Sequence, residues 1–220
     1  WLNRDRFILS AGHAAELLYS TMFLCGYPFM IEDLKNYRKY DSKTPGHPDI
    51  KTPGIEVSTG LSGEGFATAV GIALAEKIYE EKFNYKSKGM FDKTKLLPLI
   101  DYNTYVLVSD GDLMEGISYE AASLASQFNL DNLIVLYDSN NVTLDGELDD
   151  KYSENIANVY ADLGWDVIYV KNGENIKELN KAIQKKQENL KQQKMERFGF
   201  MVALWDGGSM KTRQLKKSKN

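Results

Sequence analysis

Two short apolar runs, separated by one segment of helical periodicity, constrain the fold of this chain more than any other feature. The runs are residues 105–108 and 133–137, and both have the length and aliphatic composition of buried strands. Asp110 follows the first run and Asn140 follows the second. Parallel strands end at one edge of their sheet, where open α/β sheets bind ligands. We therefore expect the Asp110 carboxylate and the Asn140 amide to face one crevice.

The same alternation of strand and helix continues to the end of the chain. Strands are expected at residues 104–108, 133–137, 165–170 and 200–204, and helices at residues 14–24, 31–40, 66–83, 115–128, 153–163 and 176–190. This order predicts an α/β fold with a doubly wound, mostly parallel sheet flanked by helices. We interpret residues 1–204 as a single domain. Residues 205–220 form a basic tail, which is more typical of a solvated, disordered end than of a nucleic-acid patch.

Composition argues against several classes of protein. A formal net charge of −4 disfavours nucleic acid as a partner. The single cysteine, Cys25, cannot form an intrachain disulfide, which suits a reducing compartment. No apolar run approaches the roughly 20 residues that span a bilayer, and no signal peptide is recognisable. We expect a cytoplasmic protein without membrane partners and, since the chain starts at Trp1, a piece of something larger.

Two loop segments are candidates for ligand contacts. Residues 41–60 are rich in proline and glycine and lack periodicity, and ordered loops of this length are often functional. His47 lies near the middle of this loop, although composition alone fits a surface histidine equally well. Residues 60–65 form a glycine-rich turn before the helix at 66–83. Such a turn brings backbone N–H groups close to a ligand, but it is also an ordinary way to start a helix.

The residues around the predicted crevice suit a metal ion that carries a diphosphate. Asp110, the Asn140 side chain and the Val142 carbonyl offer the hard oxygen ligands that Mg²⁺ and Ca²⁺ accept. Mg²⁺ takes only one or two protein carboxylates and completes its shell with water and phosphate oxygens. Gly111 has no side chain, so its N–H can approach those oxygens. Each motif alone fits an ordinary turn, and only their joint placement favours the metal site.

The chain resembles the N-terminal, thiamine-diphosphate-binding domain of transketolase. The resemblance extends over most of residues 1–170 and includes DRFILSAGH, KTPGHP, the turn at residues 60–65, DGDLMEG and EAASLA. The pairing of Asp110 with Asn140 is shared by all thiamine-diphosphate enzymes. The motifs around His13 and His47 are specific to transketolase-like members.

The resemblance implies roles for individual residues. Asp110, Asn140 and the Val142 carbonyl match metal ligands for Mg²⁺ or Ca²⁺. Gly111 and His13 match residues that contact the cofactor diphosphate. Gly60, Leu61 and Ser62 match the turn that lies against the cofactor rings. His47 matches a histidine that binds the ketose donor, and Glu115 and Glu120 match dimer-interface glutamates that link two active sites.

Some positions depart from the family pattern. Leu61 and Ser62 replace proline and leucine, Glu64 replaces glutamine, and Ser109 replaces glycine. Residues 206–211 lack the histidines that follow the last strand in the family. An earlier segment with a catalytic histidine and the pyrimidine-binding domain are also missing, so we expect this chain alone to be inactive.

The resulting hypothesis is the cofactor-binding domain of a transketolase, which transfers two-carbon ketol units between sugar phosphates. It is expected to act as a homodimer or with a complementary pyrimidine-domain subunit. Two alternatives stay open. One is a non-catalytic, transketolase-like remnant or interface module, and the other is a related enzyme such as dihydroxyacetone synthase or deoxyxylulose-phosphate synthase.

Overall fold

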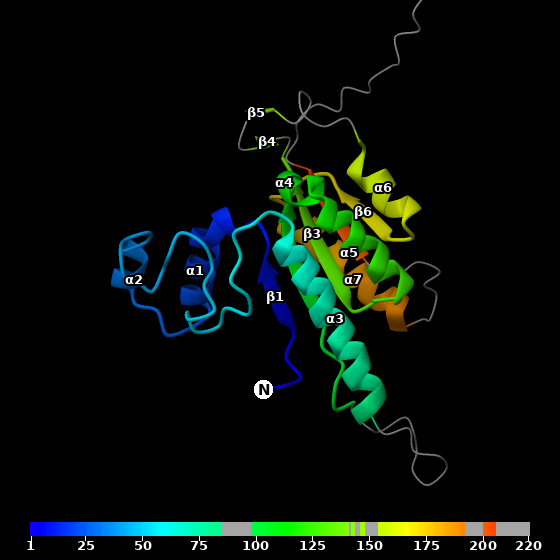
Figure 1. Ribbon diagram of the computed structural model, residues 1–220, viewed down its shortest axis with the longest axis horizontal. Coiled ribbons are helices and arrows are strands. Elements are labelled where there is room, and N and C mark those ends of the chain that lie inside the picture. The colour runs from blue at the N-terminus through cyan, green and yellow to red at the C-terminus, as the bar shows by residue number, and fades with distance from the viewer. Residues whose placement is uncertain (85–97, 141, 144–145, 148–153, 192–199, 206–220) are drawn as a thin grey trace, which may run out of the picture.

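A parallel five-stranded sheet forms the centre of the molecule (Figure 1). The computed structural model describes residues 1–84, 98–140, 142–143, 146–147, 154–191 and 200–205. In spatial order the strands are β1 (Arg6–Leu9), β2 (Thr104–Ser109), β3 (Leu133–Ser139), β7 (Phe200–Trp205) and β6 (Asp166–Val170). All neighbouring pairs are parallel. The predicted α/β class is therefore confirmed, and the last strand is inserted inside the sheet rather than at its edge.

Helices cover both faces of this sheet (Figure 1). One face packs against α3 (Glu64–Phe83), α5 (Gly116–Gln127) and α6 (Ile156–Asp162). The opposite face packs against α7 (Ile176–Lys191). The main core lies on the first face, where Val106 and Val108 of β2 are fully buried. Alternation of buried and half-buried residues along β2 follows from the strand period of two.

A small lobe projects from the β1 side of the sheet (Figure 1). It contains the 3₁₀ turn η1 (Gly12–Ala14), α1 (Ala15–Leu24) and α2 (Ile31–Lys35), around a core that includes Tyr19 and Phe29. The long loop that follows is held by threonine hydroxyls. Thr44 donates to the Asp33 carbonyl at 2.6 Å, and Thr59 donates to the Leu9 carbonyl at 2.7 Å. The expectation of an ordered loop is confirmed.

Several boundaries differ from the sequence-based expectations. β1 was not predicted, because four residues are too short for a clear period, and α2 ends at Lys35 rather than near residue 40. The helix expected at residues 115–128 is α5, which the structure bounds within one residue at each end. A short helix that was not predicted, α4 (Asp110–Met114), precedes it, and Glu115 between the two is extended, with φ −74° and ψ 139°. Asp110 is therefore the first residue of a helix.

The region after β3 also departs from expectation. After β3, β4 (Val142–Thr143) and β5 (Gly146–Glu147) form an antiparallel pair that was not predicted. The helix expected from residue 153 begins at Ile156, with Asn155 as its N-cap accepting from the Asn158 amide at 3.0 Å. The connection between α3 and β2 lies largely outside the described residues, as do Ser153 and the basic tail from residue 206.

Candidate functional site

Asp110 and Asn140 lie next to each other at the carboxyl edge of the sheet, where a backbone hydrogen bond joins them. Asp110 follows β2 directly and is 1% exposed, and Asn140 follows β3. The Asn140 backbone N–H donates a hydrogen bond of 3.2 Å to Asp110 Oδ2. This contact arises because β2 and β3 are parallel and in register, with Ser109 opposite Asp138. The structure thus places a buried carboxylate and an amide from two strand ends at one point.

The other Asp110 oxygen is oriented by a tyrosine. The Tyr137 hydroxyl donates a hydrogen bond to Asp110 Oδ1, and both side chains are buried. Burial and the neighbouring Asp110 carboxylate raise the pKa of Tyr137 well above its ordinary value, so the hydroxyl stays protonated and remains a donor. Asn140 is oriented in a similar way, since its side-chain nitrogen donates to Asp138 Oδ2 at 3.1 Å.

Open space lies beside Gly111, the residue after Asp110. A Cβ added to Gly111 would meet no atom of the described chain within 4 Å, so neither packing nor a left-handed backbone requires glycine there. Val142 begins β4, which lies against α4. Within the described residues, no group of three or more His, Cys, Asp or Glu side chains could hold a metal alone. One carboxylate, one amide and a carbonyl would instead leave coordination positions for phosphate oxygens.

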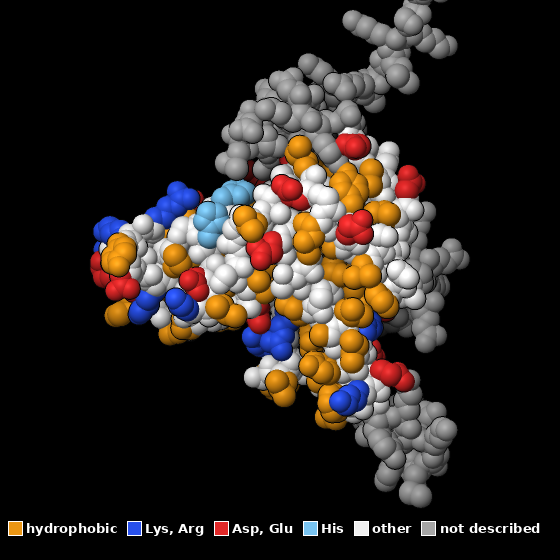
Figure 2. All heavy atoms as spheres, viewed as in Figure 1, with side chains coloured by type: hydrophobic (Ala, Val, Ile, Leu, Met, Phe, Trp, Pro, Cys, Tyr) orange, Lys and Arg blue, Asp and Glu red, His pale blue; other side chains and the backbone are white. Residues whose placement is uncertain are grey.

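The two histidine segments and the glycine-rich turn lie together. A Cβ added to Gly12 would lie 2.9 Å from His47 Cδ2, and one added to Gly60 would lie 3.9 Å from the same atom. The Tyr19 hydroxyl fixes the loop by donating to the His47 carbonyl at 3.1 Å. His13 lies in η1 next to Gly12, and both histidines are exposed. Figure 2 shows the histidine side chains as one patch where the small lobe meets the sheet.

Four other predicted residues stay at the surface of this chain. Leu61 is 74% exposed, and Ser62 beside it is exposed as well. Glu115 and Glu120, at the start of α5, are also exposed. None of the four side chains makes a hydrogen bond or ion pair within the described part of the chain, which suits groups that face a ligand or a partner.

Comparison with known proteins identifies the family of the chain. A family model described as the thiamine diphosphate binding domain of transketolase matches residues 1–198. The chain belongs to this family. A transketolase of Bacillus subtilis is 50% identical over 192 residues, which cover 87% of this chain and 27% of that relative. This transketolase-family chain thus spans about a quarter of the length of the curated relatives it matches.

Solved structures show the same family likeness. Transketolase from Campylobacter jejuni superposes with a TM-score of 0.79 and 41% identity, covering 93% of this chain and 29% of that one. Transketolase from Pichia stipitis in complex with sedoheptulose-7-phosphate gives a TM-score of 0.83 and 39% identity, covering 93% of this chain and 28% of that one.

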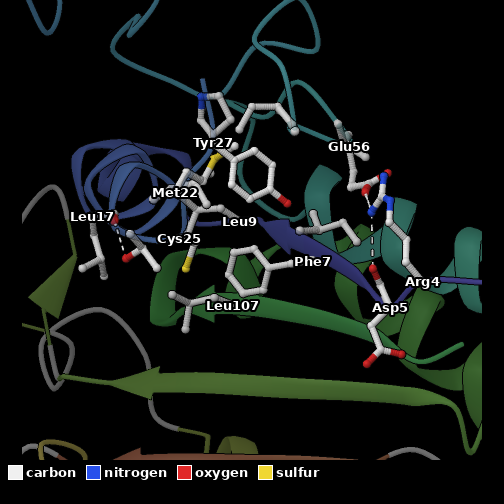
Figure 3. A pocket seen from close by; sticks show the side chains of 17 residues that line it. Arg4, Asp5, Phe7, Leu9, Leu17, Met22, Cys25, Tyr27, Glu56 and Leu107 are labelled. Carbon is white, nitrogen blue, oxygen red and sulfur yellow. Dashed lines mark hydrogen bonds and ion pairs between the residues drawn. The ribbon is translucent and has the colours of Figure 1, made fainter. Parts of the chain in front are cut away.

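An apolar cavity of about 360 Å³ lies apart from the predicted site, between α1 and the first two strands (Figure 3). Leu17 and Met22 of α1 face Phe7 of β1 and Leu107 of β2 across it. Its described lining includes none of the predicted site residues, so we do not assign the cofactor to it. None of the helices in the described part of this transketolase-family chain has the length and apolar composition that a bilayer crossing requires.

Sequence reasoning overlooked Asp112, which the structure places beneath the site. It is 2% exposed and forms a capping box with Ser109, whose amide and hydroxyl both donate to Asp112 Oδ2. A serine followed by an acid three residues later is a recognisable helix-start pattern. That signal could have identified Asp112 and predicted the helix that begins at Asp110.

Proposed function

We propose that this domain binds thiamine diphosphate through a divalent cation, Mg²⁺ or Ca²⁺, held by Asp110, Asn140 and the Val142 carbonyl. The observation that carries the proposal is the 3.2 Å hydrogen bond from the Asn140 backbone N–H to the Asp110 carboxylate, since it brings the two proposed metal-binding residues from two strand ends together. Hard oxygen donors suit such cations. When bound, the cofactor supplies a carbanion-stabilising ring for cleavage and formation of carbon–carbon bonds.

Other residues would place the cofactor and the substrate. Gly111 and His13 would contact the diphosphate, and residues 60–62 would support the rings. His47 would bind a ketose donor near its reacting carbonyl and position it for proton transfer. The supporting geometry is the approach of the His47 ring to Gly12 and Gly60.

We infer that the whole protein is a transketolase, which transfers two-carbon ketol units between sugar phosphates. Support comes from the family match and from the related Pichia stipitis enzyme in complex with a sugar phosphate. We propose a cytoplasmic enzyme in which residues 1–204 act as one domain, completed by a pyrimidine-binding domain of the same or another chain.

The partner would cover the face formed by α3 and α5, in a homodimer or a complex with the complementary domain. Exposed apolar side chains gather over these two helices (Figure 2). They include Ile78, Tyr79 and Phe83 of α3, and Ile117, Leu124 and Phe128 at α5. Apolar patches of this kind on otherwise polar surfaces mark association sites. Glu115 and Glu120 lie at one end of the face, where the resemblance expects glutamates that link two active sites.

Calorimetric titration tests the cofactor site directly. Thiamine diphosphate and Mg²⁺ are titrated into the wild-type chain, alone and mixed with a pyrimidine-binding domain from a related transketolase. Asp110→Ala is expected to abolish metal-dependent binding, because the diphosphate loses its counter-charge. The control Asp162→Ala changes an exposed acid on α6 and is expected to bind normally. Unchanged binding by Asp110→Ala would refute the metal assignment, and absence of wild-type binding would favour a non-catalytic domain.

Sedimentation velocity tests the partner face. Leu124→Lys is expected to weaken self-association or complex formation at least tenfold, because it places a charge in an apolar interface. Ile176→Lys is the matched control, since Ile176 is exposed on α7 against the opposite sheet face. Equal effects of the two variants would show that α3 and α5 do not form the interface.

A further inference from the structure

Asp112 connects three segments that are far apart in the sequence. Its Oδ1 accepts hydrogen bonds from the Ser10 hydroxyl and the Gly63 amide, both at 2.9 Å. Its Oδ2 accepts from the Ser109 amide at 2.9 Å and the Ser109 hydroxyl at 3.0 Å. A carboxylate has about four acceptor positions. The acceptor positions of this buried carboxylate are therefore occupied by groups from three segments, which follow β1, precede α3 and follow β2.

Each of these segments carries a part of the candidate site. Ser10 precedes His13 by one short turn, and Gly63 closes the turn formed by residues 60–62. Ser109 is adjacent to Asp110. Asp112 is thus the common partner of the diphosphate side and the ring side of the proposed crevice.

The packing around these hydrogen bonds leaves little room for the segments to shift. A Cβ added to Gly65 would lie 2.6 Å from Ser10 Cα. The Ser10 hydroxyl also accepts a hydrogen bond of 3.1 Å from the Phe66 amide, which ties the first turn of α3 to β1. A Cβ added to Gly63 would lie 2.8 Å from Ile117 Cγ2, so the turn rests directly on α5.

We propose that Asp112 is a positioning residue, which sets the spacing between the Asp110 metal ligand and the turn at residues 60–63. The proposal rests on the proposed function, because the spacing matters for a cofactor that contacts both sides. The hydrogen bonds from Ser10, Gly63 and Ser109 occupy the acceptor positions of Asp112, so it acts through the segments that it holds.

Asp112→Asn is the informative substitution because it preserves shape and changes one oxygen into an NH₂ group. Each Asp112 oxygen receives a backbone N–H, from Gly63 or from Ser109. An amide offers one acceptor oxygen, so one of these N–H groups must lose its acceptor and face a second donor. A hydroxyl can rotate to adapt, whereas a backbone N–H cannot.

The control substitution is Asn132→Ala at the opposite end of the sheet. Asn132 is also buried, and its side chain donates to the Ala73 carbonyl at 3.0 Å and to Glu76 at 2.8 Å. The substitution Asn132→Ala therefore removes buried hydrogen bonds and lowers stability, but it does not alter the residues of the crevice.

Hydrogen–deuterium exchange of the three proteins, without cofactor, is the first measurement. Asp112→Asn is expected to raise exchange at least tenfold in peptides covering residues 10–13 and 60–66, while peptides of α6 and β6 stay as in the wild type. Asn132→Ala is expected to leave residues 60–66 unchanged. If Asp112→Asn raised exchange equally in all peptides, or in none of them, the positioning role would be overturned.

Calorimetry with Mg²⁺ and thiamine diphosphate is the second measurement. Where the wild type binds, Asp112→Asn is expected to raise Kd about tenfold or more, and Asn132→Ala to change it less than twofold. An unchanged Kd for Asp112→Asn would overturn the proposal. Absence of binding by the wild type would count against the proposed function instead, and the exchange experiment would still decide whether Asp112 holds the turn.

Discussion

The Asn132 side-chain amide donates a hydrogen bond of 2.8 Å to the Glu76 carboxylate, and both side chains are buried. The pair links α3 to the start of β3, at the end of the sheet away from the Asp110 crevice. Burial raises the pKa of Glu76 from its ordinary 4.5 to about 7, and the negative charges of Glu80, Asp131 and Asp101 add to this rise against the opposing effect of Lys77. Glu76 is therefore a buried acid that titrates near neutral pH.

Glu76→Gln is predicted to stabilise the protein above neutral pH. Because the pKa is higher in the folded state, the folded protein binds the proton more tightly, and this stabilisation is lost as the pH rises from 4.5 through 7. Glutamine keeps an acceptor for Asn132 without the charge. Urea unfolding is expected to show a gain of roughly 2 kcal/mol at pH 8 and little change at pH 4.5.

Glu174→Gln is the control for this experiment, since Glu174 is exposed. It is expected to leave the pH dependence of stability unaltered. If wild type and Glu76→Gln lose stability in parallel between pH 5 and pH 8, Glu76 is not the titrating group.

Tyr137→Phe is predicted to weaken Mg²⁺-dependent binding of thiamine diphosphate about tenfold, because groups that orient a metal ligand typically contribute tenfold to a hundredfold to affinity. The variant removes the hydroxyl that donates to Asp110. Calorimetry at fixed Mg²⁺ measures the effect. An affinity within twofold of the wild type would contradict an orienting role.

Tyr160→Phe offers a matched comparison. Among the described atoms, the buried Tyr160 hydroxyl has no hydrogen-bond partner. Its removal relieves an unsatisfied polar group, so the free energy of unfolding is expected to stay constant or rise by about 1 kcal/mol. Cofactor affinity is expected to stay unchanged. Thermal unfolding followed by circular dichroism measures the first effect, and a clear loss of stability would show that the hydroxyl has a partner.

Gly63→Ala is predicted to destabilise the fold by roughly 2 kcal/mol, from a left-handed backbone and a steric clash together. Gly63 has φ +80°, and an added Cβ would lie 2.9 Å from Ser118 Oγ. Gly71→Ala, in the middle of α3, is the control. Its Cβ would enter open space, so helix propensity predicts a gain of about 0.5–1 kcal/mol. Urea unfolding of both variants distinguishes them by the sign of the change.

Much of the fold followed from local pattern. The strands β2 and β3 and the helices α1, α3, α5 and α7 were predicted close to their observed bounds from their local residue composition and spacing. β1 was missed, because its four residues are too short to show a clear strand period. The helix α4 was also missed, because its five residues are too short for a clear helical period.

The sequence by itself determined that Asp110 and Asn140 end two parallel strands, because alternation and spacing act within about 35 residues of chain. The tertiary structure decided how β7 enters between β3 and β6, and how His47 comes to lie beside Gly12 and Gly60. It also decided that Asp112 joins residues 10, 63 and 109. These relationships depend on hydrogen bonds and contacts between segments that only tertiary packing brings together. Sequence periodicity does not specify which distant donor will bind a buried carboxylate.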